Sequence, residues 1–531
     1  MNILNQTNIQ LKTVCFYDIK CIEMILKNHE RKIEMKIIKE KNLHIAVIIL
    51  GIIFVTIPIF HNNLWFDEAY TVGMVKNSFY DIWRIGSNDV HPVLYYWILH
   101  LVYLIFGSNI YVYRIISVIP LAILGILGYT HIKKDFGEKV GILFSFYTFF
   151  LPVTTVYAGE IRMYTWAMLF VTLMAIYAYR IYKNSTIKNW IIFAIFSLAS
   201  AYTHYYALVT AGIVNLILFI YLIYKSIKSH KENKIYSKEL KYFIISAITQ
   251  ILLYLPWIVF LLAQTKGVSD GYWIKRPSIE IFSQIYIFQF VGNLDATFIN
   301  NNIAIIFGSI LMLYTIYEMI ICKEKKVGIL AIGIYLTVFL IIYIISLKMP
   351  ILYARYFLNL TGLFIFFLVF FMAKEKRNII TLALCFITLL MAILVNINVI
   401  KMNYAQNNKQ AVEYIKQDFR EGDIVIWGNE GNGFTISMQL GENIPTYFYD
   451  KEYWNKEAAY EVFGKNMTTI KTLEPLNDYK GRIWIINGDD YKTYDQILEE
   501  YGQKIKLIKQ NKIHTDYHAY NYSITLVEKD V

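Results

Sequence analysis

The sequence predicts a polytopic α-helical membrane protein that ends in a small C-terminal α/β domain. Of its 531 residues, 56% are hydrophobic and only 17% are charged, whereas about a quarter of the residues of a soluble domain are charged. The apolar residues come in long blocks, several of which exceed the roughly 18 to 20 residues that cross a bilayer as a helix. The chain after Met402 is polar instead, so we expect it to fold outside the membrane.

The net charge of +11 is explained by membrane orientation, and we expect no nucleic-acid partner. Lys and Arg lie mainly in short loops between the apolar blocks, where positive charge keeps a loop in the cytoplasm. The four cysteines lie outside the predicted outer loops and the polar C-terminal region, at Cys15, Cys21, Cys322 and Cys385. They therefore predict neither a disulfide framework nor a cysteine metal site.

The chain divides into three predicted parts. Residues 1–42 are polar and basic, with no early apolar core of a signal peptide, and we expect them in the cytoplasm. Within them, Lys27–Lys41 is predicted either to form a basic helix on the inner membrane surface or to be a dispensable extension. Residues 43–400 form the transmembrane domain, and residues 401–531 form an extracytoplasmic α/β domain.

About eleven apolar blocks of the middle part are predicted to cross the membrane. Their approximate bounds are His44–Phe60, Tyr111–His131, Val140–Val156, Met163–Tyr182, Trp190–Tyr202, Tyr205–Tyr224, Tyr242–Leu262, Ile303–Ile321, Val327–Leu347, Phe357–Met372 and Ile379–Ile400.

The block Val93–Phe106 is predicted to lie in the outer leaflet without crossing it. It is apolar but short, and His100 interrupts it, which suits an interfacial helix better than a span. Positive charge gives an independent test, because all the basic loops fall on the side of the basic N-terminus only if this block does not cross. These loops contain Lys133–Lys134, Lys183, Lys225–Lys241, Lys323–Lys326 and Lys374–Arg377. A long first outer loop, about His61–Ile110, follows.

The polar region after Met402 alternates helical and strand patterns. Residues 411–419 (AVEYIKQDF) have the spacing of a helix, while residues 422–428 (GDIVIWG) and 481–488 (GRIWIING) read as buried strands that follow turns. This alternation predicts a small α/β domain that is large enough to have its own core.

The first outer loop contains the first two candidate site motifs. Asp67 and Glu68 follow Trp65–Phe66 where the first span ends. Adjacent carboxylates repel each other, which suits one of them to accept a proton as a general base; alternatively, the pair only solvates a helix end. His91 precedes Pro92, which we place in the first turn of the interfacial helix, and this motif also fits a structural turn.

Three further motifs fall in the other predicted outer loops. Glu160 and Arg162 lie in a short loop before Tyr164, where charges are costly unless they pair or line a polar cavity. His204 lies among tyrosines at another turn, which also fits an aromatic belt at the interface. Tyr353 and Arg355 begin the tenth span, and the Arg suits either phosphate binding or snorkelling to lipid headgroups. All five motifs lie on the same face of the membrane, and the topology that places them there is derived without them.

Taken in order, these motifs resemble those of the GT-C glycosyltransferases. The segments LWFDEAYT (64–71), DVHPVLYYW (89–97), AGEIRMYTWAMLF (158–170), YTHYYAL (202–208) and YARYFLNL (353–360) are most similar to the bacterial branch related to protein O-mannosyltransferases and aminoarabinose transferases. The resemblance covers about residues 44–400. The pattern His-Pro-Pro reads His91-Pro92-Val93 here, and the usual Arg-Tyr-Leu-Leu-Pro ends in Asn359.

The resemblance implies a multi-span fold whose long first outer loop contains in-plane helices, and a polyprenyl-phosphate sugar donor. It implies that Asp67 is the catalytic base, that Glu68 and Glu160 shape the donor and acceptor pocket, and that Arg355 holds the donor phosphate. The other expected donor-binding residues are His91, Arg162, Tyr164, His204 and Tyr353.

The implied reaction is an inverting sugar transfer to a hydroxyl group at the outer face of the plasma membrane, with no metal and no cofactor. The acceptor is a protein, a glycan or a lipid. The competing hypotheses are a transporter or flippase of a lipid-linked sugar, which tends to have sequence repeats and a polar site near the midplane of the bilayer, and a binding protein without catalytic activity. We find no repeat, and the candidate residues lie at the edge of the membrane.

Overall fold

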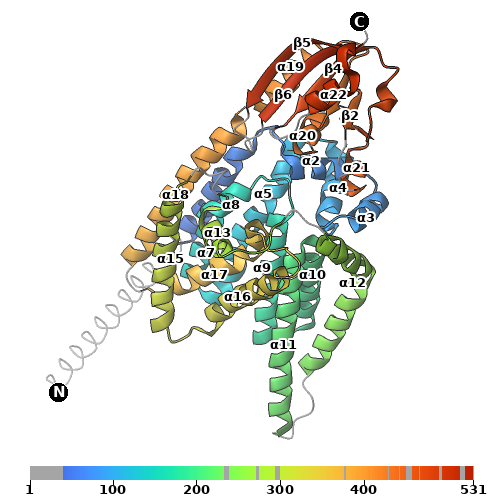
Figure 1. The fold of residues 1–531 in the computed structure, drawn as a ribbon. Helices are drawn as coiled ribbons and strands as arrows, with labels where there is room; N and C mark the ends of the chain where they lie inside the picture. Colours follow the sequence, from blue (N-terminus) through green and yellow to red (C-terminus); the bar gives the residue numbers. More distant parts are fainter. Residues whose placement is uncertain are drawn as a thin grey trace, which may run out of the picture.

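The computed structural model describes residues 40–231, 238–270, 274–293, 299–375, 378–405, 407–428, 430–441, 443–449, 457–465, 467–488, 493–514 and 521–529. A bundle of apolar helices forms most of the molecule, and a mixed sheet with flanking helices lies at one end of it, which we call the sheet end (Figure 1). The helix predicted over Lys27–Lys41 lies outside the described residues, except for its last two.

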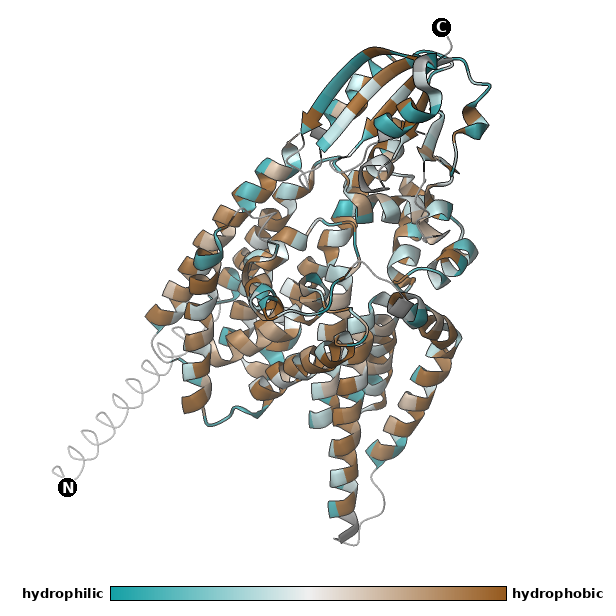
Figure 2. Ribbon diagram, viewed as in Figure 1, coloured by the Kyte–Doolittle hydropathy of each residue, from teal (hydrophilic) through white to brown (hydrophobic). Residues whose placement is uncertain are grey.

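Among the described residues, nine helices are long and apolar enough to cross a membrane, and Figure 2 shows the hydrophobic residues concentrated along them. They are Glu40–Ile59, which ends in η1 (Ile57–Ile59), α5 (Ile110–Leu127) continued by the π-helical turn η2 (Gly128–Ile132) and α6 (Lys133–Phe136), α9 (Tyr164–Lys183), α11 (Tyr205–Lys231), α12 (Lys238–Asp270), α15 (Asn301–Ile321), α16 (Lys326–Ser346), η3 (Ala354–Leu360) with α17 (Thr361–Met372), and α18 (Asn378–Tyr404). The predicted multi-pass helical class is confirmed.

Two of the eleven predicted spans are not among these nine helices. The block Val140–Val156 is broken into α7 (Glu138–Phe150) and α8 (Pro152–Tyr157), because Pro152 disfavours a helical residue before it and Leu151 is extended (φ −70°, ψ 120°). The block Trp190–Tyr202 forms α10 (Ile187–Thr203), an apolar helix of 17 residues. The sequence does not predict α13 (Glu280–Val291), which packs against α8, α15 and η3.

The first loop folds into three short helices between the bundle and the sheet (Figure 1). They are α2 (Phe66–Met74), α3 (Phe79–Ser87) and α4 (Leu94–Phe106). Because α4 has only 13 residues, it is shorter than the roughly 20 that a span needs, in line with the prediction for this block. The predicted place of Pro92 in the first turn of this helix is wrong, because Val93 caps α4 and the helix begins at Leu94, two residues after Pro92.

The helix α17 forms the centre of the bundle. Every one of its residues is buried, and it is apolar on all sides, as expected of a helix surrounded by other helices. Gly362 allows close packing here, because a Cβ atom at this position would lie 2.0 Å from Thr172 Oγ1 of α9. The turn η3 precedes α17 at the sheet end, so this rigid helix anchors Arg355.

The C-terminal region forms a six-stranded mixed sheet with the strand order β3-β2-β1-β4-β6-β5. Its strands are β1 (Ile424–Trp427), β2 (Thr446–Tyr449), β3 (Thr468–Ile470), β4 (Gly481–Asn487), β5 (Ile505–His514) and β6 (Asn521–Lys529), and its helices are α19 (Asn407–Lys416), α20 (Glu430–Leu440), α21 (Glu457–Phe463) and α22 (Thr493–Tyr501), with the short turns η4 (Glu474–Leu476) and η5 (Gly502–Lys504). β1 to β4 pair in parallel, and β6 pairs antiparallel to β4 and β5. The predicted helix and both predicted strands are confirmed, while the domain boundaries stay predictions.

The two faces of the sheet have separate cores. Because alternate residues of a strand point to opposite faces, Ile424 and Ile426 of β1 join a small core under α22, whereas Val425 and Trp427 point the other way. The second set belongs to the same continuous core as the bundle and α2. The sheet domain is thus packed onto the first loop through one of its faces.

Candidate active site

The first turn of α2 carries Asp67 and Glu68 at the sheet end of the bundle. Trp65 caps the helix in an extended conformation (φ −103°, ψ 173°), so both carboxylates lie near the positive end of the helix dipole, which favours them. Adjacent helix residues point roughly 100° apart. The two side chains therefore meet different partners, and their chemical settings differ.

Asp67 lies between two arginines that come from distant parts of the chain. Its Oδ2 accepts a hydrogen bond of 2.9 Å from Arg355 Nη2 and lies 3.8 Å from Arg162 Nε. The side chain of Asp67 is 17% exposed, while that of Arg162 is only 3% exposed. A reachable carboxylate thus stands beside two guanidinium groups, which combines a proton acceptor with charges that attract an anion.

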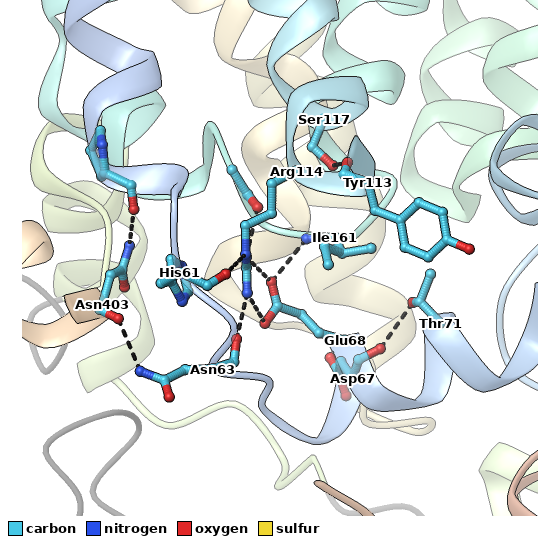
Figure 3. Close-up of polar contacts among 12 residues, drawn as sticks. His61, Asn63, Asp67, Glu68, Thr71, Tyr113, Arg114, Ser117, Ile161 and Asn403 are labelled. Carbon is cyan, nitrogen blue, oxygen red and sulfur yellow. Dashed lines mark hydrogen bonds and ion pairs between the residues drawn. The ribbon is translucent and has the colours of Figure 1, made fainter. Parts of the chain in front are cut away.

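Glu68 is buried in an ion pair with Arg114 of α5 (Figure 3). The guanidinium donates to both carboxylate oxygens, at 2.6 Å and 3.1 Å, and the Ile161 backbone N–H donates to Oε1 at 3.0 Å. Arg114 also donates to the carbonyl oxygens of His61, Asn63 and Gly159. Because Glu68 is 1% exposed and both of its oxygens accept hydrogen bonds, it joins α2 to α5 and to the loop of Glu160.

Aromatic rings surround the guanidinium of Arg355. Its Cζ lies 4.8 Å from the ring centroid of Trp65 and 5.1 Å from that of Tyr353, with Tyr164 and Tyr356 at 6.0 Å and 5.9 Å. Such contacts stabilise a planar cation by roughly 0.5 to 2 kcal/mol each. The rings hold Arg355 in place while one of its edges faces Asp67.

Arg162 contacts α2 at its first turn as well as at the Asp67 carboxylate. Its Nη1 donates to the Asp67 carbonyl oxygen, Thr71 Oγ1 and Tyr96 OH at 3.2 to 3.4 Å. The Thr71 hydroxyl in turn donates to the Asp67 carbonyl oxygen at 2.9 Å. Arg162 therefore positions the first turn of α2 and contributes positive charge beside the Asp67 carboxylate.

His91, His204, Tyr164 and Tyr356 form an aromatic cluster next to the arginines. The rings of His91 and His204 are 6.2 Å apart, and Tyr356 lies 5.1 Å from His204. Burial, reinforced by the charge of Arg162, lowers the pKa of His204 to about 3 and that of His91 well below its ordinary value. The backbone N–H of Tyr206 donates to His204 Nδ1, so the neutral ring carries its proton on Nε2.

Glu160 and Arg355 line a cavity of about 190 Å³. Trp65, Glu68, Arg114 and Tyr353 contribute to the same cavity wall. Burial raises the pKa of Glu160 to about 8, opposed by the charge of Arg355 and reinforced by the carboxylates of Glu68 and Asp67. Glu160 therefore carries a proton for much of its time near neutral pH.

The nine predicted site residues gather at the sheet end, around Asp67 and Arg355. Sequence reasoning missed Arg114, Trp65 and Tyr356. Arg114 lies within the apolar block that forms α5. This position is a signal that could have revealed it, because a charge inside a span demands a buried partner. Asp89, the first residue of the His91 motif, lies close enough to Arg162 to interact with its charge.

Two further features separate this site from the rest of the bundle. A larger cavity of about 400 Å³ lies between α9, α11, α16 and α17, but its walls are mostly apolar and none of the nine predicted site residues lines it. Within the parts of the chain that the structure describes, no three His, Cys, Asp or Glu side chains gather in a way that could hold a metal ion.

Comparisons with known proteins find one similarity of sequence over part of the chain and one similarity of fold over most of it. A family model described as dolichyl-phosphate-mannose-protein mannosyltransferase matches residues 90–260, which include His91, Glu160, Arg162 and His204. The fold is similar to the crystal structure of ArnT from Cupriavidus metallidurans in the apo state, with a TM-score of 0.60 and 8% identity over 91% of this chain and 97% of that chain. The structure of the same protein bound to undecaprenyl phosphate gives a TM-score of 0.59 and 9% identity over the same shares. No curated protein matches the sequence.

At this level of identity, the structural matches establish the fold. The chain has a fold similar to that of ArnT over nearly its whole length. The fold predicted from the motifs is therefore confirmed.

Proposed function

We propose that this chain with the GT-C fold is a membrane glycosyltransferase that moves a sugar from a polyprenyl-phosphate donor to a hydroxyl acceptor. The observation that carries the proposal is the Asp67–Arg355 ion pair, in which a reachable carboxylate oxygen lies 2.9 Å from a guanidinium held by aromatic rings. The family match and the ArnT fold support this class of reaction, and ArnT itself was crystallised with undecaprenyl phosphate.

The donor phosphate competes with Asp67 for Arg355. Before the donor binds, the guanidinium is paired with the Asp67 carboxylate. A phosphate competes with the carboxylate for the planar guanidinium, because two of its oxygens also accept two parallel hydrogen bonds and it carries a full negative charge. Donor binding thus turns Arg355 toward the phosphate and releases Asp67 Oδ2 for the acceptor.

The transfer is a direct displacement at the anomeric carbon. The acceptor oxygen forms the new C–O bond as its proton passes to Asp67, and the bond between the anomeric carbon and the phosphate oxygen breaks. Polyprenyl phosphate leaves with that electron pair, so the configuration inverts. Arg355 and Arg162 stabilise the growing negative charge more in the transition state than in the ground state. The reaction as written uses no metal and no cofactor.

The remaining site residues bind the donor or position the base. The neutral His204 offers Nε2–H to a sugar or phosphate oxygen, and His91 and Tyr164 complete this wall. Tyr353 supports Arg355 by stacking. Glu160, mostly protonated below its raised pKa, accepts or donates a hydrogen bond at the cavity without repelling the phosphate. Glu68 is a positioning residue, because Arg114 engages both of its oxygens.

The reaction takes place at the outer face of the plasma membrane in this proposal. The basic loops between spans assign the other end of the bundle to the cytoplasm by the positive-inside rule, together with the N-terminus. The sheet domain then lies outside the cytoplasm, beside a protein, glycan or lipid acceptor.

Purified protein in vesicles, supplied with undecaprenyl-phosphate sugars that carry a radiolabel, tests the proposal. Mass spectrometry of surface glycans and lipids from cells with and without the protein identifies the sugar and the acceptor to use. Transfer of label to that acceptor, with release of undecaprenyl phosphate, supports the transferase. Movement of the intact labelled lipid across the vesicle membrane without release of undecaprenyl phosphate would instead establish the flippase.

A further inference from the structure

The helix α2 is held from two sides by different parts of the chain. Asp67 and Thr71, one helical turn apart, face Arg162 of the bundle. Phe66, Tyr70 and Gly73 recur at the same helical spacing on another face, and this face meets the sheet domain. The orientation of the proposed base therefore depends on both contacts.

Two phenylalanines of the sheet domain form the centre of the second contact. Phe434 of α20 and Phe463 of α21 are stacked, with centroids 3.9 Å apart and ring planes 7° apart. Phe66, the residue directly before Asp67, lies 5.7 Å from Phe434, and Tyr70 lies 6.3 Å from Phe463. Rings at these distances attract each other beyond their burial alone.

Close backbone packing and an ion pair extend this contact. A Cβ atom on Gly73 would lie 2.7 Å from Val462 Cγ1, so only glycine permits the observed approach of α2 to α21. At the rim, Arg84 Nη2 of α3 lies 2.6 Å from Glu461 Oε2. Both side chains are more than a third exposed, so this pair contributes little stability and mainly sets the alignment.

We infer that the sheet domain positions α2, so that Phe434, Val462 and Phe463 keep Asp67 in line with Arg355 and Arg162. This gives the C-terminal domain a role in the reaction through the position of the base, independent of any contact with the acceptor. The effect on turnover rests on the proposed function; the effect on α2 itself does not.

Hydrogen exchange of the α2 amides, followed by mass spectrometry on the full-length protein, measures the positioning directly. Phe463→Ala removes the ring that contacts both Phe434 and Tyr70, and we expect exchange of residues 66–74 to rise about 10-fold or more. Ile497→Ala is the matched control, because Ile497 is fully buried in the core on the opposite face of the sheet. It leaves α2 exchange within about 2-fold of the wild type if the sheet domain acts locally.

A pair of substitutions at the close approach gives a rescue test. Gly73→Ala improves helix propensity but places a methyl group against Val462, so it speeds α2 exchange. Val462→Ala removes Cγ1 and, on its own, disturbs α2 less than Gly73→Ala does. The double variant Gly73→Ala with Val462→Ala returns α2 exchange part of the way to wild type, because the clash with Cγ1 is gone while the distance of 3.1 Å to the Val462 carbonyl oxygen remains.

The rate of sugar transfer tests the functional consequence. Because a displacement of about 1 Å in a reacting group costs up to about 100-fold in rate, Phe463→Ala lowers kcat by about 10-fold or more, and Phe463→Leu restores most of it. The affinity for undecaprenyl phosphate stays within a few-fold.

Unchanged α2 exchange in Phe463→Ala, or an equal rise in Ile497→Ala, would overturn the inference. A wild-type kcat in a Phe463→Ala variant whose α2 amides exchange faster would also overturn the inference. If the wild type transfers no sugar, the proposed function fails, while the exchange and rescue results still decide whether the sheet domain positions α2.

Discussion

Replacing Glu68 by Gln separates a positioning carboxylate from a reacting one. The change keeps the shape of the side chain and an oxygen for the Ile161 N–H but removes the negative charge that Arg114 contacts at 2.6 Å. Since the two side chains are 1% and 2% exposed, the variant leaves a buried guanidinium without its counter-charge. Removing one partner of such a pair costs about 3 to 5 kcal/mol.

The double variant Glu68→Gln with Arg114→Met measures how strongly the two side chains are coupled. Arg114→Met alone strands the Glu68 charge and also removes the donors to three carbonyl oxygens, each worth about 1 kcal/mol. Glu68→Gln combined with Arg114→Met leaves no unpaired charge and loses mainly those carbonyl bonds. We therefore expect the double variant to be no less stable than Arg114→Met alone, which corresponds to a coupling of at least about 3 kcal/mol.

Unfolding in detergent micelles, titrated with SDS and followed by circular dichroism, measures these differences. The folded fraction of Glu68→Gln also retains sugar transfer within about 10-fold of the wild type, because its role is positional. Additive effects of the two single substitutions on the free energy of unfolding would refute the ion-pair account. Loss of transfer in a fully stable Glu68→Gln protein would show that Glu68 reacts directly.

Three other substitutions test the surroundings of Asp67. Arg355→Lys keeps the charge but loses the planar fork and the stacking on Trp65, so we expect about 10-fold weaker binding of undecaprenyl phosphate in a titration; unchanged affinity would remove Arg355 from the phosphate site. The pKa of Glu160 is about 8 in the folded state and about 4.3 in the unfolded state. The folded state therefore binds the extra proton, and the free energy of unfolding falls as pH rises from about 5 to 8. Glu160→Gln abolishes that decline in pH-dependent unfolding, and a wild type with no decline over this range would contradict the raised pKa. His204→Phe keeps the ring packing but lacks Nε2–H, so it weakens donor binding. Because the pKa of His204 is about 3, the loss of affinity is the same at pH 6 and pH 8. A loss confined to pH 6 would mean that a charged imidazole binds the donor.

Local sequence patterns predicted most of the spans, the short helix α4 and the strands β1 and β4 of the C-terminal domain. Length and hydropathy are sufficient for these elements, because a bilayer demands a run of about 20 apolar residues. The break at Pro152 and the helix α13 escaped this reasoning. Apolar residues continue through the break, and an apolar pattern does not distinguish a span from a helix buried among others.

The sequence predicted that nine candidate residues lie together at one face, but it did not predict how they pair. Asp67 and Glu68 are adjacent and chemically alike. Nothing in the sequence indicates that Asp67 faces Arg355 and Glu68 faces Arg114. That division depends on the direction in which each side chain leaves α2, and on partners that lie 288 and 46 residues away along the chain. The contact of Phe66 with Phe434 is equally remote, so the role of the sheet domain became visible only in the folded molecule.

Asp67→Asn tests the central claim most directly. The amide occupies the same space and can still contact Arg355, but it cannot take the acceptor proton. Transfer of labelled sugar from undecaprenyl phosphate to the acceptor is predicted to fall by about 10²- to 10⁴-fold. Affinity for undecaprenyl phosphate is retained or increased, because the phosphate no longer competes with a carboxylate for Arg355, and the protein still folds. Transfer at the wild-type rate in a folded Asp67→Asn protein would contradict the assignment of the base.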